Sequence, residues 1–127
     1  MKIEHIALYV HDLEGARKFF LSYFDATANT LYHNTRTGFK SYFLSFEDGA
    51  RLEIMTKPEL SDSGVSTNQF GYAHLAFSVG SKEEVDRLTA KLAQNGYAVI
   101  SGPRITGDGY YESCILGFEN NLIEITV

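Results

Sequence analysis

The sequence contains few of the residues that mark several large classes of protein. Of its 127 residues only one is cysteine, Cys114, two are proline and none is tryptophan. A single cysteine excludes an intrachain disulfide and a metal cluster held by several thiolates. No apolar stretch approaches the roughly 20 residues of a membrane span. The first residues also lack the basic and apolar regions of a signal peptide, because Glu4 and His5 interrupt them. We therefore expect a cytoplasmic protein without a membrane partner.

The sequence has no excess of positive charge. Its 11 Lys and Arg residues face 16 Asp and Glu residues, which gives a formal net charge of −5. Nucleic-acid-binding domains usually carry a basic patch, so nucleic acid is not an expected partner. The 44% of apolar residues, with nine Phe and eight Tyr, are enough for the core of one domain over residues 1–127. We interpret Cys114, within the strand-like "SCIL", as a small buried residue.

The first strand-like segment of the chain recurs in its second half. "IEHIALYV" at residues 3–10 is similar to "YAHLAFSV" at residues 72–79, and this places His5 and His74 at equivalent positions, 69 residues apart. One such match has little weight on its own, because short apolar segments are common.

A second pair of segments repeats at nearly the same period. "SYFLSFEDGARLEI" at residues 41–54 is similar to "SCILGFENNLIEI" at residues 113–125, with Glu53 and Glu124 71 residues apart. Fixed-period similarity in two separate segments favours a duplicated unit. The sequence therefore predicts one domain of two modules, at about 1–56 and 72–127, joined by a polar link at 57–71.

Each module shows the same order of elements, βαβββ. The predicted strands cover 3–10, 28–33, 39–46 and 50–56 in the first module and 72–79, 97–101, 111–117 and 121–127 in the second. Asp12 is the expected N-cap of the first helix. Ser81 and Glu84 form a capping-box pattern at the second helix, which Asn95 and Gly96 close. The predicted class is α+β, with curved, mostly antiparallel sheets and the helices outside.

Side-chain alternation predicts that two polar residues of each module lie on the sheet face away from the helix. These residues are His5 and Glu53 in the first module and His74 and Glu124 in the second. Two interpretations fit them. Two imidazoles and two carboxylates can satisfy one another as a buried polar cluster, or they can bind a divalent metal ion. The repetition of a His–Glu pair favours the metal site.

These motifs resemble the vicinal oxygen chelate superfamily along nearly the whole chain, and in particular its glyoxalase I-like members. The resemblance is carried by "EHIALYVHDLEGARKFF", "RLEIMT", "YAHLAFSV" and "GFENNLIEIT". It is also a resemblance to the broader glyoxalase, bleomycin resistance and dioxygenase family. In the glyoxalase I-like members the His of the first strand and the Glu of the fourth strand of each module bind metal. The resemblance thus implies His5, Glu53, His74 and Glu124 as ligands of one divalent ion, which could be Ni²⁺, Zn²⁺, Co²⁺, Mn²⁺ or Fe²⁺.

The resemblance also implies an activity. In glyoxalase I-like enzymes the metal chelates two adjacent substrate oxygens and stabilises an enediolate, while a metal-site carboxylate moves the proton α to the carbonyl. Glu124 is then the expected base, with Glu53 across the metal. The implied reaction is a lyase or isomerase step on a 2-oxoaldehyde–thiol adduct or a similar small molecule. This branch pairs modules of two chains, which implies a homodimer with metal sites at the interface.

Two departures from the bacterial glyoxalase I pattern concern the residues that hold glutathione. Tyr9 stands where that pattern has Arg, and Lys57 where it has Asn. We therefore expect weak or no activity on glutathione adducts, with the thiol left open. Two alternatives remain. One is a thiol transferase of the fosfomycin-resistance type, against which Ala7 stands in place of the Thr of that branch. The other is a metal-free binding protein of the bleomycin-resistance type, which usually lacks the four ligands.

Five further residues are candidates for substrate binding. The segment "SGPRITGDGYYES" at 101–113 is expected to be a glycine-containing loop beside the second module, able to close over substrate. In it Arg104 could meet an anion, and a tyrosine hydroxyl could donate a hydrogen bond. An ordinary turn with packed tyrosines fits equally well. The candidates, including two tyrosines on the ligand face, are Tyr9, Tyr72, Arg104, Tyr110 and Tyr111.

Overall fold

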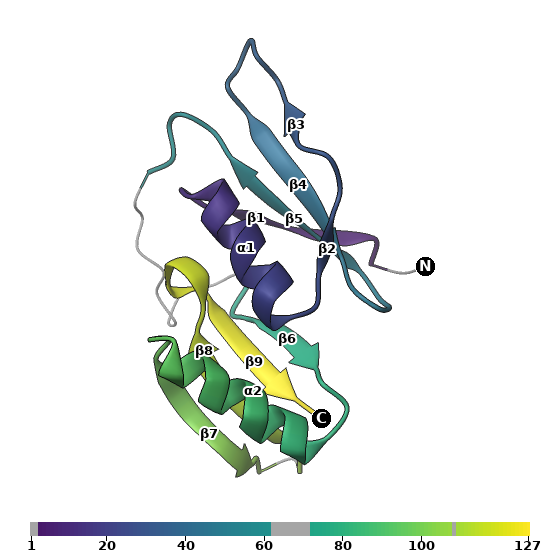
Figure 1. Cartoon of the computed structure of the whole chain (residues 1–127), viewed down its shortest axis with the longest axis vertical. Coiled ribbons are helices and arrows are strands. Elements are labelled where there is room, and N and C mark those ends of the chain that lie inside the picture. The colour runs from purple at the N-terminus through teal and green to yellow at the C-terminus, as the bar shows by residue number, and fades with distance from the viewer. Residues whose placement is uncertain (1–2, 62–71, 108) are drawn as a thin grey trace. The chain divides into compact units, whose positions relative to one another are not determined.

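The computed structural model describes residues 3–61, 72–107 and 109–127. The chain divides into two compact units, residues 1–63 and 64–127. In the described residues each unit contains one α-helix and one β-sheet (Figure 1). Most of the predicted link, residues 62–71, lies outside the described part of the chain.

The first unit is a mixed sheet with a helix on one face. Helix α1 covers Leu13–Tyr23, and the strands are β1 (His5–Tyr9), β2 (Thr27–Ala28), β3 (Tyr32–His33), β4 (Lys40–Ser45) and β5 (Arg51–Thr56). The strand order is β1-β5-β4-β2, with β3 also on β4. The β1–β5 pair is parallel and the other pairs are antiparallel.

The second unit repeats this plan. Helix α2 covers Lys82–Gln94, the strands are β6 (Leu75–Ser78), β7 (Val99–Ile105), β8 (Tyr111–Leu116) and β9 (Leu122–Thr126), and a 3₁₀ turn covers Phe118–Asn120. The strand order is β6-β9-β8-β7, and here β6 and β9 are the parallel pair. The predicted α+β class, with mostly antiparallel sheets, is confirmed.

Local chemistry explains where the helices begin and end. The Asp12 side chain accepts a hydrogen bond from Gly15 N, and the Ser81 hydroxyl accepts one from Glu84 N, so each helix starts at its predicted cap. Helix α2 ends at Asn95, after which Gly96 adopts a φ of +89° that glycine reaches without steric cost. Tyr97 N then donates to Leu92 O and belongs to this cap.

Two predicted strand boundaries are wrong. The segment at 28–33 is not one strand, because Phe43 N donates its hydrogen bond to the Asn29 side-chain oxygen and the ladder breaks into β2 and β3. The strand predicted at 97–101 begins later, because Tyr97 is part of the helix cap, and it extends to Ile105. Residues 101–105 therefore belong to a strand and not to the predicted loop.

The helix-facing side of each sheet forms the core of its unit. Leu52 and Ile54 of β5, and Ile123 and Ile125 of β9, are almost completely buried. Helix α1 packs on β4 and β5, and α2 packs on β7, β8 and β9. The residues between these buried positions consequently point to the opposite face, which is the face that carries the candidate ligands.

Candidate metal-binding residues and their surroundings

The first His–Glu pair lies on neighbouring parallel strands. Ala7 of β1 is the register partner of Glu53 of β5, so His5 lies two residues before that partner and on the same sheet face. His5 Nε2 is 4.0 Å from Glu53 Oε2. The two side chains are 39% and 16% exposed, which leaves their donor atoms accessible from one side.

The second pair has the same construction. Ala76 of β6 is the register partner of Glu124 of β9, and His74 lies two residues before it. His74 Nε2 is 3.1 Å from Glu124 Oε2, and the side chains are 39% and 23% exposed. The sequence repeat thus corresponds to a repeated arrangement in space, within each unit.

The surroundings of the two pairs differ. Around His5 the Glu4 carboxylate contacts both the imidazole and the Arg51 guanidinium. The hydrogen bonds to His5 and then to Arg51 hold the pKa of the Glu4 carboxyl below its usual value. Beside Glu124 lies Cys114, its register partner on β8. Burial, and then the Glu124 charge, raise the pKa of the Cys114 thiol, so this thiol is not activated.

The donor atoms of each pair suit a divalent ion, but each pair supplies only one nitrogen and one oxygen. One imidazole nitrogen and one carboxylate oxygen are ligands that Zn²⁺, Ni²⁺, Co²⁺, Mn²⁺ and Fe²⁺ accept. Within the described residues no group of three or more His, Cys, Asp or Glu residues could hold a metal ion. Two pairs together would supply the two nitrogens and two oxygens of the predicted set. The chemistry of these four side chains thus suits a divalent ion.

The structure places the substrate-binding candidates in different settings. Tyr9 of β1 is 46% exposed, and Lys57 Nζ lies 5.0 Å from its ring centroid. Tyr72 precedes β6 and is 96% exposed, so strand alternation does not fix its direction. Arg104 is in β7, with Glu112 as its register partner.

The two consecutive tyrosines of the predicted loop separate. Tyr110 precedes β8 and is exposed, and its backbone N–H donates to Thr106 Oγ1. The Tyr111 hydroxyl donates to Asp86 Oδ1 of α2 at 2.7 Å, which raises the pKa of Tyr111. Tyr111 therefore points to the helix side of its sheet, whereas Glu124 is on the other side.

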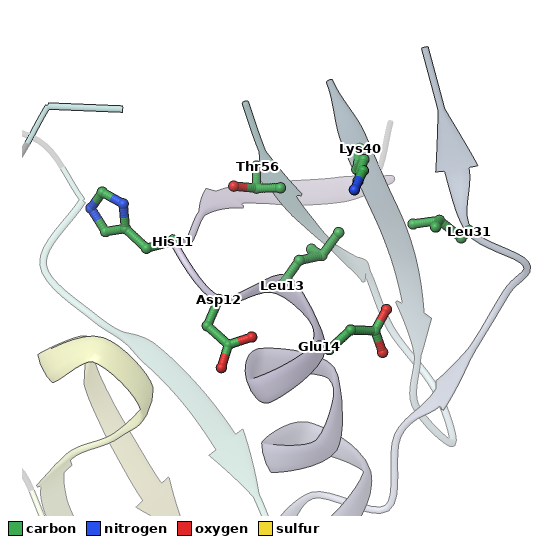
Figure 2. Close-up of a pocket in the computed structure, with 7 residues that line it drawn as sticks. All are labelled: His11, Asp12, Leu13, Glu14, Leu31, Lys40 and Thr56. Atoms are coloured by element: carbon green, nitrogen blue, oxygen red, sulfur yellow. The ribbon is translucent and has the colours of Figure 1, made fainter. Parts of the chain in front are cut away.

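A pocket of about 250 Å³ lies at the start of α1 in the first unit (Figure 2). It is lined by His11, Asp12, Leu13, Glu14, Leu31, Lys40 and Thr56. Asp12 accepts from the helix backbone and Glu14 accepts from the Tyr42 hydroxyl. Both carboxylates of the pocket already accept hydrogen bonds, and none of the four candidate ligands lines it. This pocket is therefore separate from the His–Glu pairs.

His5 was predictable from the sequence as a candidate ligand, but its contact with Glu4 was not. Alternation places Arg51 on the face of Glu53, which the structure bears out. It gave no indication that Glu4 would reach His5, because adjacent strand residues point to opposite faces.

Among the described residues, no helix is long and apolar enough to cross a membrane.

A fold of two βαβββ-type units, each presenting a His–Glu pair, defines a class of paired-module proteins with candidate metal ligands. The family model described as Glyoxalase/Bleomycin resistance protein/Dioxygenase superfamily matches residues 2–125. The chain belongs to this superfamily. The predicted family resemblance is thereby confirmed.

This chain is also similar in sequence to one protein of Bacillus subtilis and in fold to a solved domain structure. It is 34% identical over 115 residues to the Bacillus subtilis (strain 168) protein YqjT, described as uncharacterized, covering 86% of this chain and 85% of that one. The glyoxylase/bleomycin resistance protein/dioxygenase domain from Frankia sp. EAN1pec superposes with a TM-score of 0.84 at 18% identity, over 100% of this chain and 97% of that one.

A third relative was solved with a metal. The fosfomycin resistance protein FosX from Listeria monocytogenes, complexed with Mn(II) and a sulfate ion, is 25% identical to this chain. The match has a TM-score of 0.71 and covers 98% of this chain and 90% of that one.

Proposed function

We propose that this protein is a metal-dependent, glyoxalase I-like lyase or isomerase. The observation that carries the proposal is the repeated His–Glu pair, His5 with Glu53 and His74 with Glu124, at equivalent sequence positions, with His5 in β1 and His74 immediately before β6. If the two pairs made only internal polar contacts, nothing would explain why their side chains stay partly exposed in both units. One divalent ion bound by all four residues accounts for the repetition.

The chemistry follows from the ligand set. His5, Glu53, His74 and Glu124 would hold the divalent ion, which would supply Lewis-acid stabilisation of charge on adjacent substrate oxygens. Glu124 would take the proton α to the substrate carbonyl, with Glu53 as the second carboxylate of the set. The substrate is a small molecule with vicinal oxygens, such as a 2-oxoaldehyde–thiol adduct.

The remaining substrate-binding candidates would orient the substrate. Tyr9 and Tyr72 offer aromatic surface and a hydroxyl group each, while Arg104 and Tyr110 offer groups that bind anions and donate hydrogen bonds. Tyr111 was a further candidate, but its hydroxyl is already bound to Asp86. Because Tyr9 and Lys57 replace the residues that hold glutathione in bacterial glyoxalase I, we propose a thiol other than glutathione. The functional form is a cytoplasmic homodimer.

A titration with Zn²⁺, with metal analysis of the purified protein, tests the proposal. Wild-type protein should bind about one ion per chain, and Glu53→Gln and His74→Ala should each weaken binding at least tenfold, since each removes a ligand. His33→Ala is the matched control, because this exposed histidine of β3 lies outside both pairs and should leave the affinity unchanged. Unchanged affinity in both ligand variants would refute the metal site.

The similarity to FosX favours one second candidate. At 25% identity to a fosfomycin resistance protein solved with Mn(II), the same four residues could serve a metal-dependent thiol transferase. Parallel assays with 2-oxoaldehyde–thiol adducts and with fosfomycin plus thiols, each with Mn²⁺, Ni²⁺ and Zn²⁺, separate the two reactions. A protein that binds none of these ions would instead support the metal-free binding protein.

A further inference from the structure

The side chain of Glu4 bridges two residues beside the first His–Glu pair. Its Oε1 accepts a hydrogen bond from Arg51 Nη2, and its Oε2 contacts His5 Nδ1. The main chain holds the same residues together, because Arg51 N donates to Glu4 O at 3.1 Å. Glu4 is therefore fixed by both its backbone and its carboxylate, although the side chain is about half exposed.

An aromatic ring supports this bridge from within the sheet. The Arg51 guanidinium lies 4.2 Å from the ring centroid of Phe43, and the His5 ring packs edge to face on the same ring, at 5.3 Å and 86°. Phe43 is the register partner of Glu53 on β4. One ring thus contacts both partners of Glu4 and limits how far the imidazole can rotate.

The contact with Glu4 determines which histidine nitrogen is free. An ionised carboxylate only accepts hydrogen bonds, so the shared hydrogen must be on His5 Nδ1. The lone pair of neutral His5 is then on Nε2, the nitrogen that faces Glu53. Histidines that bind metals commonly donate their other ring N–H to a carboxylate, which fixes the tautomer and the orientation of the ring.

We propose that Glu4, held in place by Arg51, is a positioning residue that keeps His5 in the Nδ1–H tautomer with Nε2 directed at the metal. This inference rests on the proposed function for the identity of the metal site. The orientation of His5 in the metal-free protein does not depend on it.

The second unit does not repeat Glu4 and Arg51 at the equivalent positions. Ala73 takes the place of Glu4 and Leu122 the place of Arg51, so neither residue can accept from His74 or hold a carboxylate there. His74 Nε2 is already 3.1 Å from Glu124 Oε2, a distance at which Nε2–H donates to the carboxylate. The Nε2 atom of His5 therefore already carries the lone pair that a metal needs, whereas the hydrogen on His74 Nε2 must first move to Nδ1 by a change of tautomer.

Nitrogen-15 NMR of the imidazoles in metal-free protein tests the tautomer directly. In spectra recorded at alkaline pH, the His5 signals, assigned with His5→Ala, should show Nδ1–H, while those of His74 should show Nε2–H. Glu4→Ala should abolish the Nδ1–H preference of His5, and Glu4→Gln should keep part of it, because its amide oxygen still accepts. Glu84→Ala is the matched control, since Glu84 is also exposed and bound to an arginine, Arg87. A His5 tautomer that is unchanged in Glu4→Ala overturns the proposal.

Zinc titration tests the consequence for metal. Glu4→Ala should weaken Zn²⁺ binding about tenfold or more, Glu4→Gln should weaken it less, and Glu84→Ala should leave it unchanged. Arg51→Leu, which copies the second unit, should weaken binding in the wild-type background but add nothing in Glu4→Ala. Unchanged affinity in Glu4→Ala would overturn the role in metal binding. If wild-type protein binds no zinc, the proposed function fails, and the NMR result still decides the role of Glu4 in orienting His5.

Discussion

At the scale of single residues, Tyr42 shows how one hydroxyl joins a helix to a sheet. It is a buried residue of β4 whose hydroxyl donates to Glu14 Oε1 of α1 at 2.6 Å, while the Arg17 guanidinium lies 5.4 Å from its ring centroid. The hydrogen bond to Glu14, and then burial, raise the pKa of Tyr42. The protonated phenol is therefore the form that the folded state favours.

Tyr42→Phe should lower the free energy of unfolding by about 1 kcal/mol near neutral pH, because it removes this hydrogen bond. Because the pKa of Tyr42 is higher in the folded state, its contribution to stability is fully present at pH values below the unfolded tyrosine pKa of about 10. That contribution is lost as pH rises through the higher folded pKa. Urea unfolding across alkaline pH should thus show the two proteins converging, and Tyr32→Phe, at an exposed tyrosine, should match wild type throughout. A difference that stays constant with pH would contradict this assignment.

The residues of the candidate site differ in how far the sequence could predict them. His5, Glu53, His74 and Glu124 were predictable as two similar pairs, because the repeat and strand alternation both depend on local periodicity. The Glu4–His5 contact was not predictable from alternation. Glu4 precedes the first residue of β1, so its side chain does not follow the pleat of the strand.

At the scale of elements, β7 differs most from the sequence-based expectation. Its pairing with β8 shifts register between Val99 and Ser101 and again between Ser101 and Arg104. Gly102 lies within this irregular stretch with a φ of +78°, and a Cβ atom there would lie 2.4 Å from Glu112 O. The close approach of the β8 backbone at this point requires glycine.

Gly102→Ala should therefore destabilise the protein by about 1–3 kcal/mol, through both the left-handed φ and the clash with the neighbouring strand. Gly107→Ala is the matched control in the same hairpin, because nothing lies within 4 Å of its added Cβ and it should stay within about 0.5 kcal/mol of wild type. Thermal or urea unfolding of the two variants measures the difference. Equal stability of both would show that the bend at Gly102 accommodates a side chain.

The helices were more predictable than the strands for a physical reason. Capping depends on residues three positions apart, such as Ser81 and Glu84, so it is written locally in the sequence. The division into β2 and β3 depends on Asn29 reaching Phe43, fourteen residues away, and the register shifts of β7 depend on β8. Such pairings between strands are not visible in the pattern of one strand.

At the scale of the whole molecule, the main consequence is that each unit supplies only two donors. His5 and Glu53 belong to the first unit, and His74 and Glu124 to the second. The proposed four-residue ligand set therefore needs a first unit and a second unit, from one chain or from two. Exchange between two chains would give a twofold-symmetric homodimer with two equivalent sites.

Mixing two variants with different broken halves distinguishes these arrangements. His5→Ala breaks the first half-site and Glu124→Ala the second, so neither variant alone should bind Zn²⁺ tightly. If sites form between chains, a heterodimer joins the intact first unit of the Glu124→Ala chain to the intact second unit of the His5→Ala chain. Random exchange after mild denaturation and refolding should then restore tight zinc binding to about a quarter of the wild-type capacity, since half of the dimers each regain one of two sites. If sites form within one chain, every site keeps a broken half and zinc binding stays absent, even when mass spectrometry verifies that heterodimers have formed. Refolding each variant alone is the control, and recovery in either one would show that the lost residue is not a ligand.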